Sequence, residues 1–306
     1  MENENLIHNI LVAIDGSEHS LAAVTFLSDL HFRSLSTRRK CLITALGVLP
    51  PRDASSHTTY LIPVRQAQKI LQEKGYKVMT EQILGHPSEV IINYAESHAP
   101  DMVIVGAKGL RATLGILLGG VAQQIVEYAS CPVLVVRAPY DRMQKVLLVN
   151  DGSESSQQAT QFLAHFPFYK RVKIFIAHVL PPTPVLKTEY ILRTWSISDV
   201  AFQYYPVSSE EELNHQLEQE EEKGRNILKQ ATLILESCSR SSTSVLLRGD
   251  AATEIIEYTK KFNIDMIVAG SRGLSQMQSW LLGSVSRKLV HYAPCSVMIV
   301  KQRLAK

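Results

Sequence analysis

The stretch IDMIVAGSRGLSQMQSWLLGS, residues 264–284, constrains the fold of this chain more than any other. It begins with an apolar run of the length of a buried strand, and glycines follow at positions 270, 273 and 283. Glycine has no Cβ atom, so its backbone can adopt positive φ angles and its N–H group can approach an anion closely. Ser284 is a good N-cap and apolar residues follow it at helical spacing, which predicts a helix start. A glycine-rich strand end followed by a helix N-terminus favours a phosphate site.

The spacing of these glycines differs from two common phosphate-binding motifs. It is neither the dinucleotide G-x-G-x-x-G nor the Walker G-x-x-x-x-G-K-[ST]. The segment between the glycines, residues 274–282, is predicted to be a loop or short helix that connects the strand end to the phosphate-binding helix. Physical arguments alone therefore support an anion site here without identifying its ligand.

The chain contains an internal duplication. ILVAIDGSEHS, which contains Asp15, recurs as VLLVNDGSESS, which contains Asp151, 136 positions later. PDMVIVGAKGL, which contains Gly106, recurs as IDMIVAGSRGL, which contains Gly270, 164 positions later. Two copies of one fold explain both matches. The second copy therefore has 28 additional residues between its first strand and its glycines.

We expect two domains, of residues 1–140 and 141–306, because a chain of this length suits about two. The boundary is placed in APYDRMQK, residues 138–145, a polar joint with a proline. Each predicted domain alternates apolar runs of strand length with amphipathic segments of helix length. This alternation predicts a doubly wound α/β fold, with a parallel sheet covered by helices on both faces. In such sheets, ligands bind at the carboxyl ends of the strands, where the strand order reverses.

Composition excludes several classes of function. The chain is 45% hydrophobic and 20% charged, with a net charge of +3, so nucleic acid is not an expected partner. The start, MENENLIHN, does not resemble a secretory signal, and no apolar run approaches the roughly 18 residues of a membrane span. The four cysteines are scattered, at positions 41, 131, 238 and 295. We therefore expect reduced thiols in a cytosolic protein rather than zinc ligands or disulfides.

The pattern G-x-x-G, nine residues, G-[ST] resembles the nucleotide-binding signature of the universal stress protein family. The stretch that starts at Gly270 matches this signature at every fixed position, and the DGSE loops and the closing CPVLVV also look like the family. The resemblance covers nearly the whole chain as two tandem domains. It implies five-stranded parallel α/β domains that bind ATP or another adenine nucleotide in the motif-bearing members, with or without Mg²⁺. Which residues would hold a metal is left open.

The resemblance also implies a set of binding residues. Asp151 would lie near the ribose, and the main chain of Val179 would contact adenine. The positions around the phosphates would be Gly270, Arg272, Gly273, Gly283, Ser284, Val285 and Ser286. The corresponding positions of a weaker site in the first domain are Asp15, Val48, Gly106, Lys108, Gly109, Gly119 and Gly120.

The first domain departs from the family pattern. Gly120 stands where Ser284 stands in the second domain, and Ala122 replaces Ser286. The backbone N–H groups survive both changes, and a lost hydroxyl contact costs about 0.5–1.5 kcal/mol. We therefore expect tighter nucleotide binding in the second domain.

Simpler roles compete with the ligand roles of the charged residues. Asp15 and Asp151 each precede Gly-Ser and a helix, so either could be a helix cap. Lys108 and Arg272 could be solvated loop charges, the usual state of such side chains.

No known catalytic set is present in the sequence. The first-strand loops read D-G-S-E, and neither H-E-x-x-H nor G-x-S-x-G nor a kinase-type catalytic loop occurs. The leading hypothesis is therefore a stress-response protein that binds an adenine nucleotide as a regulatory ligand, with slow ATP hydrolysis at most. The alternatives are a scaffold that acts through protein contacts without nucleotide, and an adenylating or phosphotransfer enzyme.

The 28 additional residues fall within about residues 181–222. Their first part is rich in aromatic residues and proline, and an acidic helical segment follows. Its apolar stripe consists of Leu213, Leu217, Gly224, Leu228, Ala231 and Leu235. One interpretation is a lengthened helix with a covering loop. The other is a lid or a protein-binding surface, because exposed aromatic residues favour interfaces.

The closing strands CPVLVV and CSVMIV are predicted to lie at sheet edges, where unpaired backbone groups can bind another strand. In the resembled family such edges pair between subunits. Here the two copies can pair within one chain as an internal pseudo-dimer. The residues near its seam would be Val133, Val135, Val297 and Ile299. A further homodimer through the insertion remains open.

Overall fold

The computed structural model of the chain describes residues 7–32, 34–51, 57–109, 117–183, 210–273 and 282–301. Its strands are β1 (Asn9–Ala13), β2 (Leu42–Leu49), β3 (Lys77–Leu84), β4 (Met102–Gly106), β5 (Val133–Val136), β6 (Lys145–Val149), β7 (Lys173–Leu180), β8 (Ser242–Arg248), β9 (Met266–Gly270) and β10 (Ser296–Val300). Its helices are α1 (Glu18–Ser28), α2 (Leu35–Lys40), α3 (His57–Glu73), α4 (Pro87–His98), α5 (Gly120–Tyr128), α6 (Glu154–His165), α7 (Glu210–Ser237), α8 (Ala251–Phe262) and α9 (Ser284–Tyr292).

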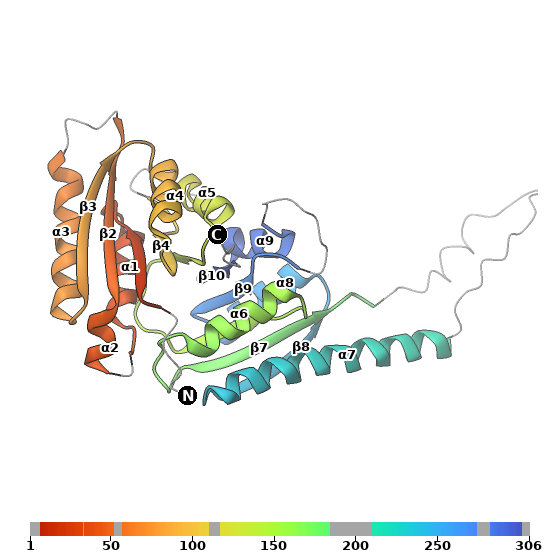
Figure 1. Cartoon of the computed structure of the whole chain (residues 1–306). Helices are drawn as coiled ribbons and strands as arrows, with labels where there is room; N and C mark the ends of the chain where they lie inside the picture. The colour runs from red at the N-terminus through yellow and green to blue at the C-terminus, as the bar shows by residue number, and fades with distance from the viewer. Residues whose placement is uncertain are drawn as a thin grey trace, which may run out of the picture.

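The described strands form one ten-stranded sheet in the order β3-β2-β1-β4-β5-β10-β9-β6-β7-β8 (Figure 1). The strands of each half are parallel, and the two halves have the same internal order. In each half the order reverses after the third strand, so the switch points lie between β1 and β4 and between β6 and β9. The doubly wound α/β fold predicted from the alternating pattern is confirmed.

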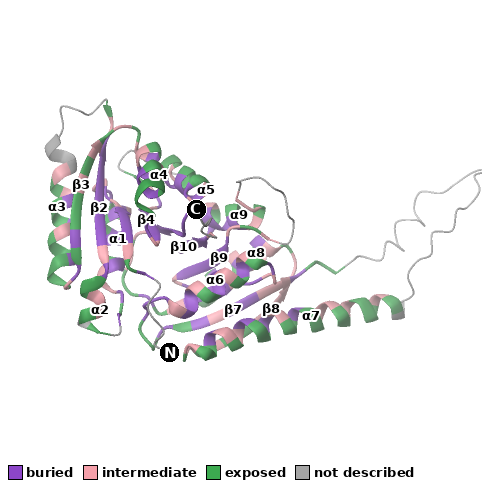
Figure 2. Cartoon of the chain, viewed as in Figure 1, coloured by how far each residue is buried: buried purple, intermediate pink, exposed green. Residues whose placement is uncertain are grey.

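Helices cover both faces of the sheet, and each face carries one hydrophobic core. One core contains residues of α1, α3, α6 and α7, and the other contains residues of α4, α5, α8 and α9. Both cores contain residues from both halves of the chain. The inner strands are buried, whereas the edge strands β3 and β8 are partly exposed, as are the outer surfaces of the helices (Figure 2). Burial on both faces explains why the inner strands read as continuous apolar runs.

Side-chain caps fix where several helices begin. Ser17 and Ser153 are the N-caps of α1 and α6, and their side chains accept the N–H groups of Ser20 and Ser156. Asp250 caps α8 in the same way. Helix α2 was not predicted from the sequence, because it is short and polar and has no apolar stripe.

The insertion lengthens α7, which packs on β7, β8 and α6. Gly224 allows a close approach, because a Cβ atom there would lie 2.8 Å from the Cδ1 atom of Leu246. The predicted stripe is buried at Gly224, Leu228, Ala231 and Leu235 and half-buried at Leu213 and Leu217. The lengthened helix is therefore present. The proline-rich and aromatic part of the insertion lies mostly at residues 184–209, outside the described residues.

The halves join through their closing strands. β5 and β10 pair antiparallel, with Val135 opposite Val297 and Val133 opposite Ile299. All four side chains are buried. The predicted pairing of the closing strands within one chain is confirmed by this register.

Each half also caps a helix of the other half across this seam. The guanidinium of Arg137, which follows β5, donates to the carbonyls of Val290 and His291 in the last turn of α9, at 2.9 and 3.2 Å. The ammonium of Lys301, which follows β10, donates to the carbonyls of Glu127 and Ala129 at the end of α5, at 2.9 and 2.7 Å. Cations satisfy the open carbonyls of a helix C-terminus and interact favourably with its dipole. The two halves thus exchange equivalent caps.

Replacing Val135 by lysine is expected to lower the free energy of unfolding by about 3 kcal/mol or more, because a buried ammonium would lose its hydration without gaining a partner. Val135 is 1% exposed, whereas Val121 of α5 is 39% exposed and provides a matched control. Val121→Lys should change stability by less than about 0.5 kcal/mol. Urea denaturation followed by circular dichroism measures both variants. Equal midpoints for the two would place the stabilising contacts elsewhere.

Candidate functional site

The predicted site residues of the second half meet at the carboxyl ends of β6 and β9, at the switch point. Asp151 follows β6, and Gly273 lies in the turn after β9. A Cβ atom on Gly273 would lie 2.8 Å from the Oδ2 atom of Asp151, so the carboxylate lies directly against the glycine backbone. The hydroxyl of Ser153 donates to the carbonyl of Arg272, 3.4 Å away, and ties the same two loops together. The structure therefore brings Asp151, Arg272 and Gly273 together.

The aspartates hold turns and are not the helix caps. The Oδ1 atom of Asp151 accepts the N–H of Ser153 at 3.0 Å, and Ser153 itself caps α6. Asp15 makes the same bond to Ser17 at 2.9 Å, and Ser17 caps α1. The cap interpretation of these aspartates is therefore wrong, because a serine two positions later fills that role. The second oxygen of each carboxylate, Oδ2, lies against a glycine of the facing turn, Gly273 for Asp151 and Gly109 for Asp15.

Gly270 is required by close packing rather than by an unusual φ angle. A Cβ atom there would lie 2.6 Å from the carbonyl carbon of Ser155, in the first turn of α6. Backbone cannot move aside as the end of a flexible side chain can. The end of β9 and the start of α6 therefore approach each other at a distance that only glycine permits.

Helix α9 begins at the far end of the glycine motif. The N–H of Gly283 donates to the carbonyl of Ser271 at 2.8 Å, which brings the residue before α9 next to the end of β9. Residues 274–281, where a connecting loop or short helix is predicted, lie outside the described residues. Gly283 caps α9 without a side-chain hydrogen bond, and the first intrahelical bond is that of Arg287 to Gly283. The N–H groups of Ser284 and Val285 therefore have no partner within the helix and suit an anion.

Ser286, which was predicted to lie near the phosphates, has a hydrogen-bond partner within the protein. It is buried, and its hydroxyl donates to the carbonyl of Gly270 at 2.7 Å. This bond holds the first turn of α9 against the end of β9. The hydroxyl hydrogen of Ser286 is therefore used in the bond to Gly270, whereas the side chain of Ser284 is exposed.

Val179 occupies a strand segment that extends past its neighbour. Strand β6 ends at Val149, and the N–H of the next residue donates to the carbonyl of Ala177 at 2.9 Å. Residues two apart in a strand direct their main-chain groups to the same side. The N–H and C=O groups of Val179 therefore point to the β6 side, beyond the last residue of β6. This position offers one donor and one acceptor at the switch point.

The first half repeats this geometry. A Cβ atom on Gly109 would lie 2.7 Å from the Oδ2 atom of Asp15, and the hydroxyl of Ser17 donates to the carbonyl of Lys108 at 3.1 Å. Gly106 packs against the backbone at the start of α1, as Gly270 packs on α6. The equivalent loop closure is the N–H of Gly119 to Ala107, at 2.8 Å. Val48 lies past the end of β1 in the same way. A Cβ atom on Gly120 would meet nothing within 4 Å.

His19 is a first-half site neighbour that the sequence did not indicate. It occupies the place of Ser155, and its Nδ1 atom accepts the N–H of Ala138 at 2.8 Å. Burial, together with the positive charge of Lys108, lowers the pKa of His19 below its ordinary value of 6.5. A neutral ring is required for this acceptor role, so the hydrogen bond and the pKa agree. Lys108 is half-buried, whereas Arg272 in the second half is exposed.

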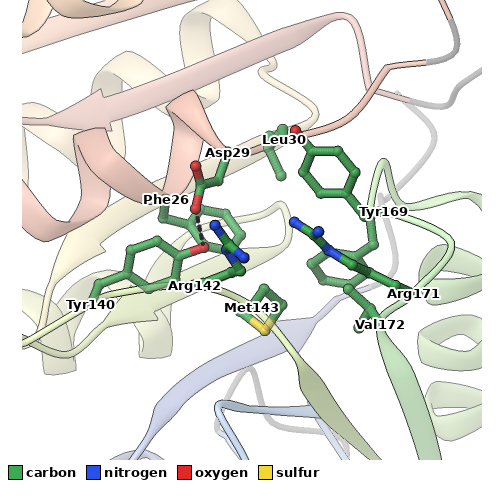
Figure 3. Close-up of a pocket in the computed structure, with 10 residues that line it drawn as sticks. Phe26, Asp29, Leu30, Tyr140, Arg142, Met143, Tyr169, Arg171 and Val172 are labelled. Carbon is green, nitrogen blue, oxygen red and sulfur yellow. Dashed lines mark hydrogen bonds between the residues drawn. The ribbon is translucent and has the colours of Figure 1, made fainter.

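A separate cavity of about 80 Å³ lies between the halves, before the first residues of β6 and β7. Figure 3 shows the guanidinium groups of Arg142 and Arg171 among aromatic side chains, with Tyr140 donating to Asp29 at 3.3 Å. This cavity is at the amino ends of β6 and β7, opposite the glycine loop of the second half. It is therefore distinct from the candidate site.

Two further properties concern the described part of the chain. No helix there has the length and apolar character needed to cross a membrane. No group of three or more His, Cys, Asp or Glu side chains there is placed to hold a metal ion.

A family model described as the universal stress protein family matches residues 7–137 and 143–301. A universal stress protein of Mycolicibacterium smegmatis is 28% identical over 329 aligned residues, which cover 97% of this chain and 98% of that protein. A universal stress protein of Methanocaldococcus jannaschii is 29% identical over 150 residues, which cover 44% of this chain and 85% of that protein.

Solved structures resemble the whole chain as well. A universal stress protein from Archaeoglobus fulgidus has a TM-score of 0.62 and 18% identity, with 98% of each chain covered. A protein from Pseudomonas aeruginosa described as a putative universal stress protein has a TM-score of 0.63 and 16% identity, with 97% of this chain and 94% of that chain covered. These likenesses concern the fold.

Replacing Gly270 by alanine is expected to lower the free energy of unfolding by about 1–3 kcal/mol, because the new methyl group would overlap backbone atoms of Ser155. Gly120→Ala is the matched control, since the same methyl group meets open space there. It should leave stability unchanged or raise it by about 0.5 kcal/mol. Chemical denaturation of both variants tests the contrast. Similar losses in the two would show that the close approach at Gly270 is not the constraint.

The lowered pKa of His19 predicts a pH dependence of stability. Below about pH 6.5 the unfolded state takes up a proton that folded His19 does not, so the free energy of unfolding should fall as the pH drops from 6.5 through the folded pKa. His19→Asn keeps an acceptor for Ala138 without titrating. Its melting temperature should therefore fall less than that of the unmodified chain between pH 7 and pH 5. Parallel pH curves for the two proteins would contradict the role given to His19.

Proposed function

This chain belongs to the universal stress protein family, and from that premise we propose that it binds ATP or a related adenine nucleotide as a regulatory ligand, chiefly in its second half. The observation that carries the proposal is the arrangement of the end of β9 and the start of α9. There a helix begins at a glycine without a side-chain cap, beside a carboxylate in contact with a second glycine. Because the chain belongs to this family, we propose an adenine nucleotide as the ligand of this arrangement.

Each part of the nucleotide has a complementary group at the proposed site. Its phosphates would accept the N–H groups of Ser284 and Val285 and the hydroxyl of Ser284, and Arg272 would supply a positive charge. The Oδ2 atom of Asp151 would accept a ribose hydroxyl. The main chain of Val179 would pair its donor and acceptor with the adenine edge.

The glycines and Ser286 shape the site. Gly270, Gly273 and Gly283 let three backbone segments approach one another, and Ser286 fixes α9 against β9. Ser286 is thus proposed as a positioning residue in this state, and its direct contact with phosphate remains a prediction. Mg²⁺ is proposed only as an optional companion of bound phosphates. Asp151 is the carboxylate at this strand end that could contact it.

The first half is proposed as a weaker site. Asp15, Lys108, Gly109 and Gly119 repeat the second-half geometry, but Gly120 offers no hydroxyl. The missing contact is worth about 0.5–1.5 kcal/mol, or roughly threefold to tenfold in affinity. Space for a serine side chain exists at Gly120, because an added Cβ atom would meet nothing within 4 Å.

The proposal assigns no catalytic residue, and it places the protein in the cytosol as a stress-response component. A scaffold with the same fold would bind partners without nucleotide. An adenylating or phosphotransfer enzyme would instead consume ATP in the presence of a second substrate. Binding without rapid turnover distinguishes the regulatory role from both.

Exchanging the residues at the two helix starts should exchange the affinities of the two sites. We expect Ser284→Gly to weaken ATP binding in the second half about threefold to tenfold, and Gly120→Ser to strengthen binding in the first half by a similar factor. Equilibrium dialysis with radiolabelled ATP, on the full chain and both variants, measures stoichiometry and dissociation constants. Luminescence detection of residual ATP reports any hydrolysis.

Arg39→Gln, on the surface helix α2, is the control and should bind like the unmodified chain. Absence of binding at millimolar ATP would favour the scaffold. Two sites of equal affinity that neither variant changes would refute the assignment of the phosphates to the starts of α5 and α9.

A further inference from the structure

A cysteine and a histidine from different helices lie side by side away from the nucleotide site. Cys238 follows the last residue of α7, and His165 is the last residue of α6. The two helices pack on the same face of the sheet. The Sγ atom of Cys238 is 3.6 Å from the Nε2 atom of His165, within reach of a sulfur hydrogen bond. Both side chains are half-buried, so reagents can reach them.

The histidine is oriented to accept the thiol proton. Its Nδ1 atom lies 2.9 Å from the carbonyl oxygen of Gln161. A carbonyl oxygen can only accept, so Nδ1 must carry the hydrogen. In a neutral imidazole the Nε2 atom then has a free lone pair, and this atom faces Cys238. A thiol beside a base that a third group orients is the arrangement that activates cysteine nucleophiles.

A cavity of about 400 Å³ adjoins this pair. Its lining includes Cys238 and His165 together with the cationic residues Lys170 and Arg240. The guanidinium of Arg240 is fixed, because it donates to the carbonyls of Phe166 and Phe168 at 2.6 and 3.3 Å. A pocket with two cations beside a thiol suits a reagent that carries carboxylates.

The other three cysteines are shielded. Cys41, Cys131 and Cys295 are buried. Burial raises the pKa of the Cys41 and Cys295 thiols to about 12, so few thiolates form there near neutral pH. They provide internal references within the same chain.

We propose that Cys238 is a reactive thiol that forms mixed disulfides with small, negatively charged disulfides. The thiol proton passes to the Nε2 atom of His165, and the Sγ thiolate attacks one sulfur of the reagent. A bond forms between Sγ and that sulfur while the reagent's own S–S bond breaks. The departing thiolate takes the proton back from His165, so one disulfide and one thiol are consumed and one of each is formed. No other oxidant is required.

The pair also lies where the two halves touch. His31, which follows α1 of the first half, lines the same cavity. Its backbone N–H donates to the carbonyl of Pro167 at 2.8 Å. An adduct on Cys238 would thus occupy space next to this contact.

The folded full-length protein is treated with iodoacetamide for increasing times, and each cysteine is quantified by peptide mass spectrometry. Cys238 should be labelled first, and His165→Asn should slow its labelling about tenfold or more. His215→Asn, on the exposed surface of α7, is the control and should keep the original rate. His165→Gln replaces the first variant if His165→Asn lowers the melting temperature. An unchanged Cys238 rate in a folded His165 variant, or faster labelling of another cysteine, would overturn the proposal.

A second measurement tests the preference for negative charge. Oxidised glutathione should give a mixed disulfide at Cys238, and Lys170→Gln should slow this reaction about threefold while leaving the reaction with the uncharged 2-hydroxyethyl disulfide unchanged. Equal effects on the two reagents would refute the role of the cationic pocket. A mixed disulfide at any other cysteine would refute the site.

Discussion

The antiparallel pairing of β5 with β10 is the contact on which the rest of the structure depends. It joins two parallel five-stranded sheets into one, and both hydrophobic cores run across it. Arg137 and Lys301 emerge from the two paired strands and each caps a helix of the opposite half. Arg137 also donates to the carbonyl of Leu117 at 2.6 Å, just before the helix start of the candidate site in the first half. Strand pairing, helix ends and one loop of a candidate site are therefore parts of a single arrangement.

Within each half, the candidate site depends on where Cβ atoms are absent. Gly270 lets the end of β9 touch the backbone of α6, and Gly273 lets the carboxylate of Asp151 lie against the loop. These contacts leave the start of α9 facing the switch point, with its first N–H groups unused by the helix. The site is thus a product of close backbone packing as much as of polar side chains. A loop assembled from larger residues could not bring the same donors to one place.

The alternation of apolar runs was sufficient to predict the fold, because a strand that is buried on both faces is apolar at nearly every position. The repeated glycines and closing strands likewise located the strand ends and the seam. The polar contacts could not be predicted in the same way. The bonds of Arg137 to α9 and of Cys238 to His165 join residues that no periodicity relates. The sequence also allowed Asp151 to be a helix cap, whereas Ser153 takes that role in the structure, after a turn that includes Gly152 with a φ angle of 83°.

Because the two halves are joined in one chain, their sequences can change independently of each other. In a homodimer of identical subunits, a substitution appears in both copies, so both sites must share its effect. Here Gly120 and Ser284 occupy equivalent helix starts with different chemistry, while the seam between their halves stays closed. The covalent connection keeps each half at a high effective concentration for the other, so dilution cannot separate them. One half can therefore lose a hydroxyl, gain a lengthened helix or acquire a reactive thiol without imposing the same change on its partner.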